Sequence, residues 1–267
     1  MNLQDSVTIA IDGSREPSAA ASPLTMWLRR KLRRISRRWR GDSPLERRGR
    51  YSRVTPYATY SPWNEDPRFR EVLRQIRGHS LVDLYRCHEL WRLVEQVAAL
   101  EGSLLEVGVW RGGSGALIAR RAADCGIEAP VYLCDTFRGV VKAGPADPLY
   151  KGGEHADTSR ATVESLVNSM QLDRVRVLEG IFPDETGHQI EGDRFRFCHI
   201  DVDTYLSARD VLEWVWPRLV VGGVVVYDDF GFAGCEGIAQ HVEEQVRAMD
   251  RIVIHNLNGH AVIIKTR

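Results

Sequence analysis

The sequence lacks several features that define whole classes of proteins. Its five cysteines are odd in number and show neither a CxxC pair nor a zinc-ligand spacing, so neither a disulfide framework nor a structural zinc site is indicated. No run approaches the roughly 18 consecutive apolar residues of a membrane span. The weakly apolar stretch 18–28 is followed, not preceded, by basic residues, which is the reverse of a secretory signal. We therefore expect a cytoplasmic protein with reduced thiols.

Net charge is also missing, because 36 basic residues balance 36 acidic ones. The distribution is uneven, since residues 29–40 hold eight basic residues and no acidic one. Apolar residues recur at helical spacing from Trp27 to Trp39, which predicts a basic amphipathic helix near residues 27–40. Such a helix favours contact with an anionic membrane surface or an acidic partner, and a solvated tail that folds only on contact is the alternative.

The chain divides into three predicted parts. Residues 1 to about 25 are rich in Ser, Ala, Pro and Asp without periodicity, and residues 1–50 are predicted to form a disordered tail with the basic helix near residues 27–40. Residues 51–100 begin with the aromatic segment Tyr51 to Trp63, read either as a mobile lid or as a strap packed on the core. N-terminal helices are expected from Pro67 to Leu100. Residues 101–267 form one α/β domain.

In this last part, strand-like and helix-like segments alternate. Strands are expected at Leu104–Val109, Val131–Cys134, Val175–Leu178, Phe195–Ile200 and Val220–Tyr227, with helices near 114–123, 159–170, 208–216 and 236–249. This alternation predicts βαβ units with right-handed crossovers. Asn258-Gly259 lies between two further apolar segments, 252–255 and 261–264, and predicts a hairpin. The predicted fold is α/β, a doubly wound, mostly parallel seven-stranded sheet with a C-terminal antiparallel hairpin.

Three carboxylates stand where predicted strands end. Asp201 follows the segment ending at Ile200, and Asp228 and Asp229 follow the one ending at Tyr227. If the two strands are neighbours, their carboxyl ends open onto one crevice, where ligands of open α/β sheets bind. Like charges repel there, so a divalent cation is a natural partner.

The first strand runs into a glycine-rich turn and then a helix, with Gly108, Gly112 and Ser114 in the turn. Glycine lets the backbone approach a ligand, and the following helix offers free N–H groups. The spacing matches neither G-x-G-x-x-G nor a P-loop. Glu106 before the turn is suited to an ammonium group, and Asp135 at the end of the second strand to ribose hydroxyls. S-adenosylmethionine carries both groups.

Six ordered segments carry a resemblance to a known family. They are Glu106-Val107-Gly108-Val109-Trp110-Arg111-Gly112-Gly113, Asp135-Thr136-Phe137-Arg138-Gly139, Gly180-Ile181-Phe182-x-Asp184, Asp201-Val202-Asp203-Thr204-Tyr205, Pro217-Arg218-Leu219-x-x-Gly222-Gly223, and Asp228-Asp229-Phe230 with Cys235 following. From about Leu84 onward the chain resembles the macrocin O-methyltransferase family, which includes the mycinamicin and novobiocin sugar O-methyltransferases. The segments 139–157 and the last hairpin do not match the family's pattern.

The resemblance implies a class I, Rossmann-like methyltransferase that uses S-adenosylmethionine and Mg²⁺ to methylate a sugar hydroxyl on a small molecule or glycan. It implies Asp201, Asp228 and Asp229 as metal ligands, with Asp201 also the general base. The cofactor residues expected from the turn and the matching segments are Glu106, Gly108, Trp110, Gly112, Ser114, Asp135, Thr136, Gly180 and Ile181. We expect a homo-oligomer and no nucleic-acid partner.

Two other functions stay open at this point. Asp201-Val202-Asp203 also fits the Asp-x-Asp of a metal-dependent glycosyltransferase, and the basic helix could make the chain a membrane-surface protein. Asp203 is expected to cap the next helix or to support the metal site from behind its ligands. His155, His199 and His260 are interpreted as surface or packing residues rather than catalytic ones.

Overall fold

The computed structural model describes residues 50–54 and 58–267, and the compact unit discussed below begins at Arg53 and ends at Arg267. The predicted basic helix at 27–40 lies outside the described residues. The helices are α2 (Pro67–Gln75), α3 (Leu84–Gln96), α4 (Gly113–Asp124), α5 (Arg160–Ser169), α6 (Tyr205–Val215) and α7 (Glu236–Gln245), with short 3-10 turns at Pro62–Asn64, Gly187–Ile190 and Trp216–Arg218. The strands are β1 (Ser103–Val107), β2 (Val131–Asp135), β3 (Val175–Glu179), β4 (Phe195–Ile200), β5 (Leu219–Tyr227), β6 (Arg251–His255) and β7 (Ala261–Lys265).

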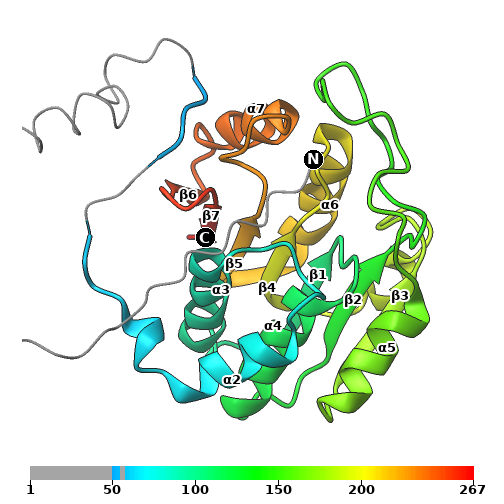
Figure 1. Ribbon diagram of the computed structural model, residues 1–267. Coiled ribbons are helices and arrows are strands. Elements are labelled where there is room, and N and C mark those ends of the chain that lie inside the picture. The colour runs from blue at the N-terminus through cyan, green and yellow to red at the C-terminus, as the bar shows by residue number, and fades with distance from the viewer. Residues whose placement is uncertain (1–49, 55–57) are drawn as a thin grey trace, which may run out of the picture. The chain divides into compact units, whose positions relative to one another are not determined.

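One seven-stranded sheet organises this unit, in the order β3-β2-β1-β4-β5-β7-β6 (Figure 1). The pairs among β1 to β5 are parallel, whereas β7 is antiparallel to both β5 and β6. The order reverses between β1 and β4, which is the position where open α/β sheets bind ligands. The predicted fold class, including the terminal hairpin, is confirmed.

Helices cover both faces of the sheet, so its central strands are buried on both faces. All five residues of β1 and all six of β4 are buried, as expected for inner strands of a parallel sheet. One hydrophobic cluster joins alternate strand residues, such as Leu104 and Phe197, to α2, α3, α4 and α5. The other cluster joins the opposite set, such as Leu105 and Cys198, to α6 and α7. The result is a three-layer α/β/α arrangement (Figure 1).

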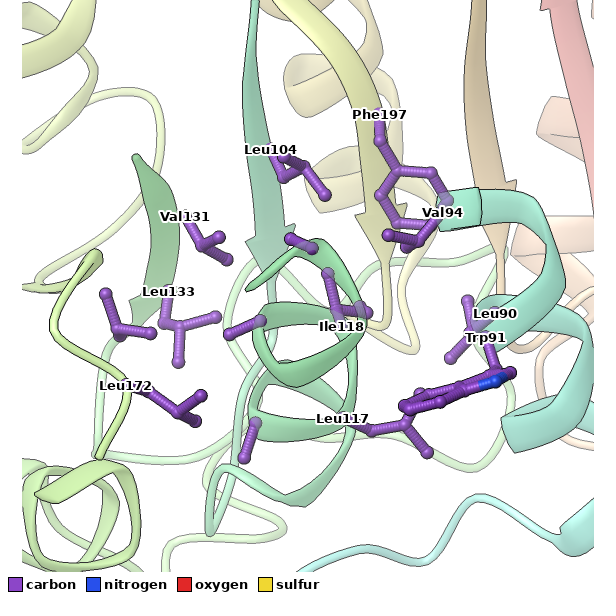
Figure 2. Close-up of a cluster of buried hydrophobic side chains, with 14 of the residues drawn as sticks. Leu90, Trp91, Val94, Leu104, Leu117, Ile118, Val131, Leu133, Leu172 and Phe197 are labelled. Atoms are coloured by element: carbon purple, nitrogen blue, oxygen red, sulfur yellow. The ribbon is translucent and has the colours of Figure 1, made fainter. Parts of the chain in front are cut away.

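Large apolar side chains fill the first of these layers. Figure 2 shows Trp91 and Leu90 of α3 beside Leu117 and Ile118 of α4, over the strand residue Leu104. All five are fully buried. By the usual scale for core residues, truncating one of them to alanine costs about 2–5 kcal/mol, so α3 and α4 form a rigid support for the strand ends above them.

The N-terminal helices expected between Pro67 and Leu100 are α2 and α3. The chain forms α2 and α3 as separate helices, and Gly78 between them has a φ of +82°. Asp83 starts α3 by accepting hydrogen bonds from the backbone N–H groups of Tyr85 and Arg86. Residues 77–80 between the two helices are Arg, Gly, His and Ser, so the apolar pattern is also interrupted there.

The aromatic segment is described only in part. Trp63 packs edge to face against Tyr85 and His88 of α3, with ring centroids 5.2 and 5.5 Å away. This end of the segment is therefore packed as a strap, and a lid formed by the rest stays a prediction. Among residues 50–54 and 58–267, no helix is long and apolar enough to cross a membrane.

Candidate functional site

A cavity of about 340 Å³ opens at the carboxyl ends of the central strands. Its walls include Gly108 after β1, Thr136 after β2, Gly180 after β3, Asp201 after β4 and Asp229 after β5. The lining is mostly apolar with a few convergent polar groups, which is typical of small-molecule sites. The sheet topology thus gathers into one place strand ends that are far apart in the sequence, such as Gly108 and Asp229.

Backbone hydrogen bonds hold the strand ends together beneath this cavity. The N–H of Asp201 donates to Val107 O at 2.9 Å, and the N–H of Asp228 donates to Ile200 O at 3.0 Å. Gly108 has a φ of +88°, and a Cβ built on it would lie 1.6 Å from the carbonyl oxygen of Asp201. The glycine is therefore required by close packing as well as by its conformation.

The turn after Gly108 is fastened by Asp135. One oxygen of its carboxylate accepts hydrogen bonds from the N–H groups of Val109 and Trp110, at 2.7 and 2.8 Å. The other accepts from Phe137 N at 2.7 Å. Gly112 then starts α4 in the left-handed conformation. Asp135, predicted to face a ribose, thus also shapes the cofactor turn, and any ribose contact must share its carboxylate.

The structure brings most of the predicted site residues to the cavity wall. Those that line it are Gly108, Trp110, Ser114, Asp135, Thr136, Gly180, Asp201, Asp228 and Asp229. Glu106, Gly112 and Ile181 do not. Gly112 lies against Val163 of α5, and the N–H of Ile181 donates to Glu185 Oε2 at 2.8 Å.

Glu106 takes a different position from the predicted one. Its side chain is fully buried under the sheet end, and Oε1 lies 2.8 Å from Nδ1 of His199. A Cβ built on Gly115 of α4 would lie 2.4 Å from Glu106 Oε2, so the carboxylate sits against the first turn of α4. Residues alternate between faces along a strand, and the face to which Glu106 points is covered by α4.

The three predicted metal ligands form one cluster. Asp201, Asp228 and Asp229 each offer a carboxylate oxygen, and these oxygens lie within 4.8 Å of one another. Burial raises the pKa of Asp201 well above its usual range, and the charges of Asp228 and Asp229 raise it further. Burial and the nearby carboxylates of Asp203 and Asp228 likewise raise the pKa of Asp229. The charge of Arg86 partly offsets this effect at Asp229, but the pKa of both carboxyl groups stays raised.

Asp228 differs from the other two. Burial alone would raise its pKa, but the imidazoles of His199 and His260 and the guanidinium of Arg86 hold it far below the usual range. Arg86 of α3 forms an ion pair with Oδ2 of Asp228 and lies over the ring of Phe232, 4.5 Å from its centroid. Asp228 is therefore ionised at any working pH.

Asp203 does not cap helix α6. The N–H of Tyr205 instead donates to Asp147, at 2.9 Å, and Asp147 comes from the long segment between β2 and α5. Asp203 has a φ of +62°, accepts a 2.5 Å hydrogen bond from Tyr150 Oη, and donates its backbone N–H to Asp229 Oδ2 at 3.1 Å. Asp203 thus lines the cavity beside Asp229, where its contacts orient Asp229 and hold Tyr150 in the same wall.

Several wall residues were missed by sequence reasoning. The segment before α3 contributes His79, Ser80, Leu81 and Val82, α3 contributes Arg86, and later segments contribute Tyr150, His155 and Phe232. Leu81 and Phe232 are also partly exposed, at 66% and 37%. The helix break at Gly78 was the one available signal, because an interrupted helix often marks a turn that reaches a site.

The donor set suits a hard divalent cation. Three carboxylates supply oxygen ligands, which Mg²⁺ prefers. Among the described residues, no hydrogen-bond donor contacts the carboxylate of Asp201, which leaves its charge open to a cation. A neighbouring group of Asp203, Asp229 and Cys235 has a similar spread, but its thiol is a soft ligand that Mg²⁺ does not favour.

Comparison with known proteins decides the family. The family model described as macrocin O-methyltransferase (TylF) matches residues 52–261. The chain belongs to this family. The macrocin O-methyltransferase family member described here is thus an S-adenosylmethionine-dependent O-methyltransferase, as the resemblance implied. This membership favours methyl transfer over the glycosyltransferase alternative.

Individual relatives agree with the family match. The chain is 31% identical over 192 residues to mycinamicin III 3''-O-methyltransferase of Micromonospora griseorubida, covering 66% of this chain and 74% of the relative. It is 32% identical over 170 residues to 8-demethyl-8-(2,3-dimethoxy-alpha-L-rhamnosyl)-tetracenomycin-C 4'-O-methyltransferase of Streptomyces olivaceus, covering 59% and 65%. The structure of the O-methyltransferase NovP has a TM-score of 0.62 at 24% identity, covering 71% and 83%, and shares the fold.

Proposed function

We propose that this macrocin O-methyltransferase family member is a Mg²⁺-dependent enzyme that methylates a sugar hydroxyl, with Asp201 as general base and Asp201, Asp228 and Asp229 as metal ligands. The observation that carries the proposal is the cluster of three carboxylates beside the glycine turn, on one wall of one cavity. A cofactor site and a cation site that share a wall would bring a methyl donor and an acceptor hydroxyl close to each other.

The acceptor class is supported by the names of the relatives. The Streptomyces olivaceus relative is named for methylation at the 4' position of a rhamnosyl group. A glycosylated natural product, a nucleotide-sugar or a polysaccharide would each present a sugar hydroxyl to the cavity. The exposed Leu81 and Phe232 of the wall suit an acceptor with an apolar part next to its sugar.

The cofactor site is assigned to the glycine turn and its neighbours. S-adenosylmethionine supplies an activated methyl group when bound there. Gly108, Trp110 and Ser114 provide backbone surface and the start of α4, and Asp135, Thr136 and Gly180 add the ends of the neighbouring strands to the same wall. Gly112 and Ile181 support this wall from behind. We assign Glu106 to the support of α4 and His199 instead of to direct ammonium contact.

Asp201 is the residue placed to receive a proton. A sugar hydroxyl is a weak nucleophile at neutral pH, and Mg²⁺ at the cluster would lower its pKa. Asp201 lacks a hydrogen-bond donor among the described residues, so one of its oxygens can accept the hydroxyl proton. Asp228 stays ionised beside Arg86, and Asp229 is held by the backbone of Asp203. The apolar wall limits the access of water.

The test compares Asp201→Asn with Asp173→Asn. Asp173 is exposed and does not line the cavity, so it serves as a matched control. Methyl transfer from S-adenosylmethionine to rhamnosyl glycosides is measured together with the calorimetric affinity for S-adenosylhomocysteine. We expect Asp201→Asn to lose at least about 100-fold in transfer while it keeps its cofactor affinity, and Asp173→Asn to behave like wild type.

Removal of the cation tests the metal part separately. EDTA should abolish transfer, and added Mg²⁺ should restore it. Full activity in EDTA would contradict metal dependence, and full activity of Asp201→Asn would contradict its role as base. A homo-oligomeric state and a membrane contact through residues 27–40 stay predictions of the sequence.

A further inference from the structure

One of the three carboxylates is held far more firmly than the others. Oδ1 of Asp228 lies 2.9 Å from Nε2 of His260 and 3.4 Å from Nε2 of His199, while Oδ2 pairs with Arg86. Among the described residues, the carboxylate of Asp229 accepts one hydrogen bond, from the backbone N–H of Asp203. Asp228 is thus the fixed point of the cluster, and its surroundings determine where the cluster's oxygens point.

His260 reaches Asp228 from the terminal hairpin. Antiparallel pairing sets Ala261 of β7 opposite Tyr227 of β5, so the next residues along, His260 and Asp228, lie side by side at the end of the sheet. His260 is fully buried, yet it is not part of the cavity wall. Its ring meets the cluster at Asp228.

A second carboxylate holds the far side of this ring. Nδ1 of His260 lies 2.6 Å from Oε2 of Glu89, in the middle of α3. The same carboxylate accepts hydrogen bonds from the side chains of Asn258, at 2.9 Å, and Asn256. Because both ring nitrogens have partners, the ring of His260 is held in one orientation. This orientation directs Nε2 toward Asp228.

We propose that Glu89 and His260 are positioning residues that hold Asp228 in the orientation needed to bind the divalent cation. The inference rests on the proposed function, because it assumes a cation at Asp201, Asp228 and Asp229. Partners behind metal ligands orient those ligands, and their loss commonly weakens metal affinity about 10–100-fold. The chain from Glu89 through His260 to Asp228 also explains why the hairpin carries a buried histidine at its turn.

A purely structural role would use the same contacts differently. Glu89 joins the hairpin to α3, so His260 could serve only to keep that joint closed. Two substitutions separate the roles, because the amide nitrogen of Asn replaces Nδ1 of histidine and that of Gln replaces Nε2. His260→Gln keeps a donor to Asp228 and loses the one to Glu89. His260→Asn keeps the donor to Glu89 and loses the one to Asp228.

The experiment measures Mg²⁺ binding to the full chain by calorimetry, with S-adenosylhomocysteine in excess. We expect His260→Asn to weaken Mg²⁺ affinity about 10–100-fold, whereas His260→Gln stays within about threefold of wild type. Glu89→Gln should fall between them, because it keeps the shape and loses the charge. Glu95→Gln is the matched control, since Glu95 lies on the same helix and pairs with Arg92 and Arg121, away from the hairpin.

Thermal unfolding without Mg²⁺ checks that each variant folds. If a His260 variant does not fold, the Mg²⁺ affinity of Glu89→Gln decides the test. Two results would overturn this inference and leave the proposed function intact, provided that wild type binds Mg²⁺. One is an unchanged Mg²⁺ affinity in His260→Asn, and the other is a larger loss of Mg²⁺ affinity in His260→Gln than in His260→Asn. If wild type binds no Mg²⁺, the metal part of the proposed function fails, and the inference fails with it.

Discussion

Glu106 of β1 and His199 of β4 are register partners in the sheet, and their side chains meet at 2.8 Å in a fully buried position. The contact removes Glu106 from the cavity wall and turns the other nitrogen of His199 toward Asp228, 3.4 Å away. A carboxylate predicted to contact the cofactor thus reaches the metal cluster through an imidazole. The cofactor side and the metal side of the site share one buried network.

Replacement of Gly108 tests the contact between the cofactor turn after β1 and the end of β4 at Asp201. In Gly108→Ala, the new Cβ would collide with the carbonyl of Asp201, so the end of β4 must shift. We expect a loss of both S-adenosylhomocysteine affinity and methyl transfer, and a loss of stability of more than about 2 kcal/mol. Calorimetry and thermal unfolding measure these effects.

Gly126→Ala is the control for Gly108→Ala. Gly126 also has a positive φ, of +72°, but nothing lies within 4 Å of its built Cβ. The Gly126→Ala substitution should lower the free energy of unfolding by only about 1–2 kcal/mol, because alanine is disfavoured in the left-handed conformation. Methyl transfer by the folded variant should be unchanged. Equal losses in the two variants would show that the close packing at Asp201 has no effect of its own.

Asp157 is expected to affect cofactor affinity from outside the cavity. Its carboxylate accepts a 2.8 Å hydrogen bond from Trp110 Nε1 and pairs with Arg111 at 2.6 Å. Because Trp110 lines the cavity, Asp157→Ala should raise the KM for S-adenosylmethionine severalfold with little change in kcat. Glu164→Ala, which removes an exposed pair with Arg160, should leave both constants unchanged. A fall in kcat alone would argue against a role in cofactor binding.

Metal binding should also appear as stability. A cation that binds only the folded chain raises the free energy of unfolding by about 2.7 kcal/mol at a concentration one hundred times its Kd. We expect Mg²⁺ to raise the Tm of wild type and to have little effect on Asp229→Asn, which removes one ligand of the cluster. Thermal melts with and without Mg²⁺ test this, and an equal rise in both proteins would point to a cation site elsewhere.

His241 predicts a pH dependence that is independent of the active site. It is buried beside the hydroxyl of Tyr227, 3.1 Å away, and near Glu244 and Arg251. Burial lowers the pKa of His241 to about 4 from its ordinary 6.5. As the pH falls from 6.5 toward 4, the unfolded chain binds a proton that the folded chain does not, so this contribution to stability is present above pH 6.5 and is lost on acidification.

His241→Phe should therefore reduce the loss of stability between pH 7 and 4.5 by about 2 kcal/mol. Denaturant unfolding at the two pH values gives the measurement. His255→Gln, at a more exposed histidine of the same C-terminal region, should leave the pH dependence as in wild type. An unchanged pH dependence in His241→Phe would show that His241 takes up its proton in the folded state.

Much of the fold followed from local pattern. The alternation of strands and helices, the Asn-Gly turn and the six family segments predicted the sheet and the family, and both are confirmed. The reason is that apolar periodicity and turn residues act over a few residues at a time. The position of the break between α2 and α3 was not predicted, although residues 77–80 contain no apolar side chain.

The site depended on distances that no local pattern records. The sequence by itself determined which side chains stand at strand ends, so it could bring Asp201, Asp228 and Asp229 together as a prediction, since ends of parallel strands share an edge. Only the tertiary structure decided that Glu106 turns under α4, that Arg86 reaches the cavity, and that His260 faces Asp228 with Glu89 behind it. Those contacts join residues as many as 171 positions apart, and they depend on which helix covers which face of the sheet and on the pairing of β7 with β5.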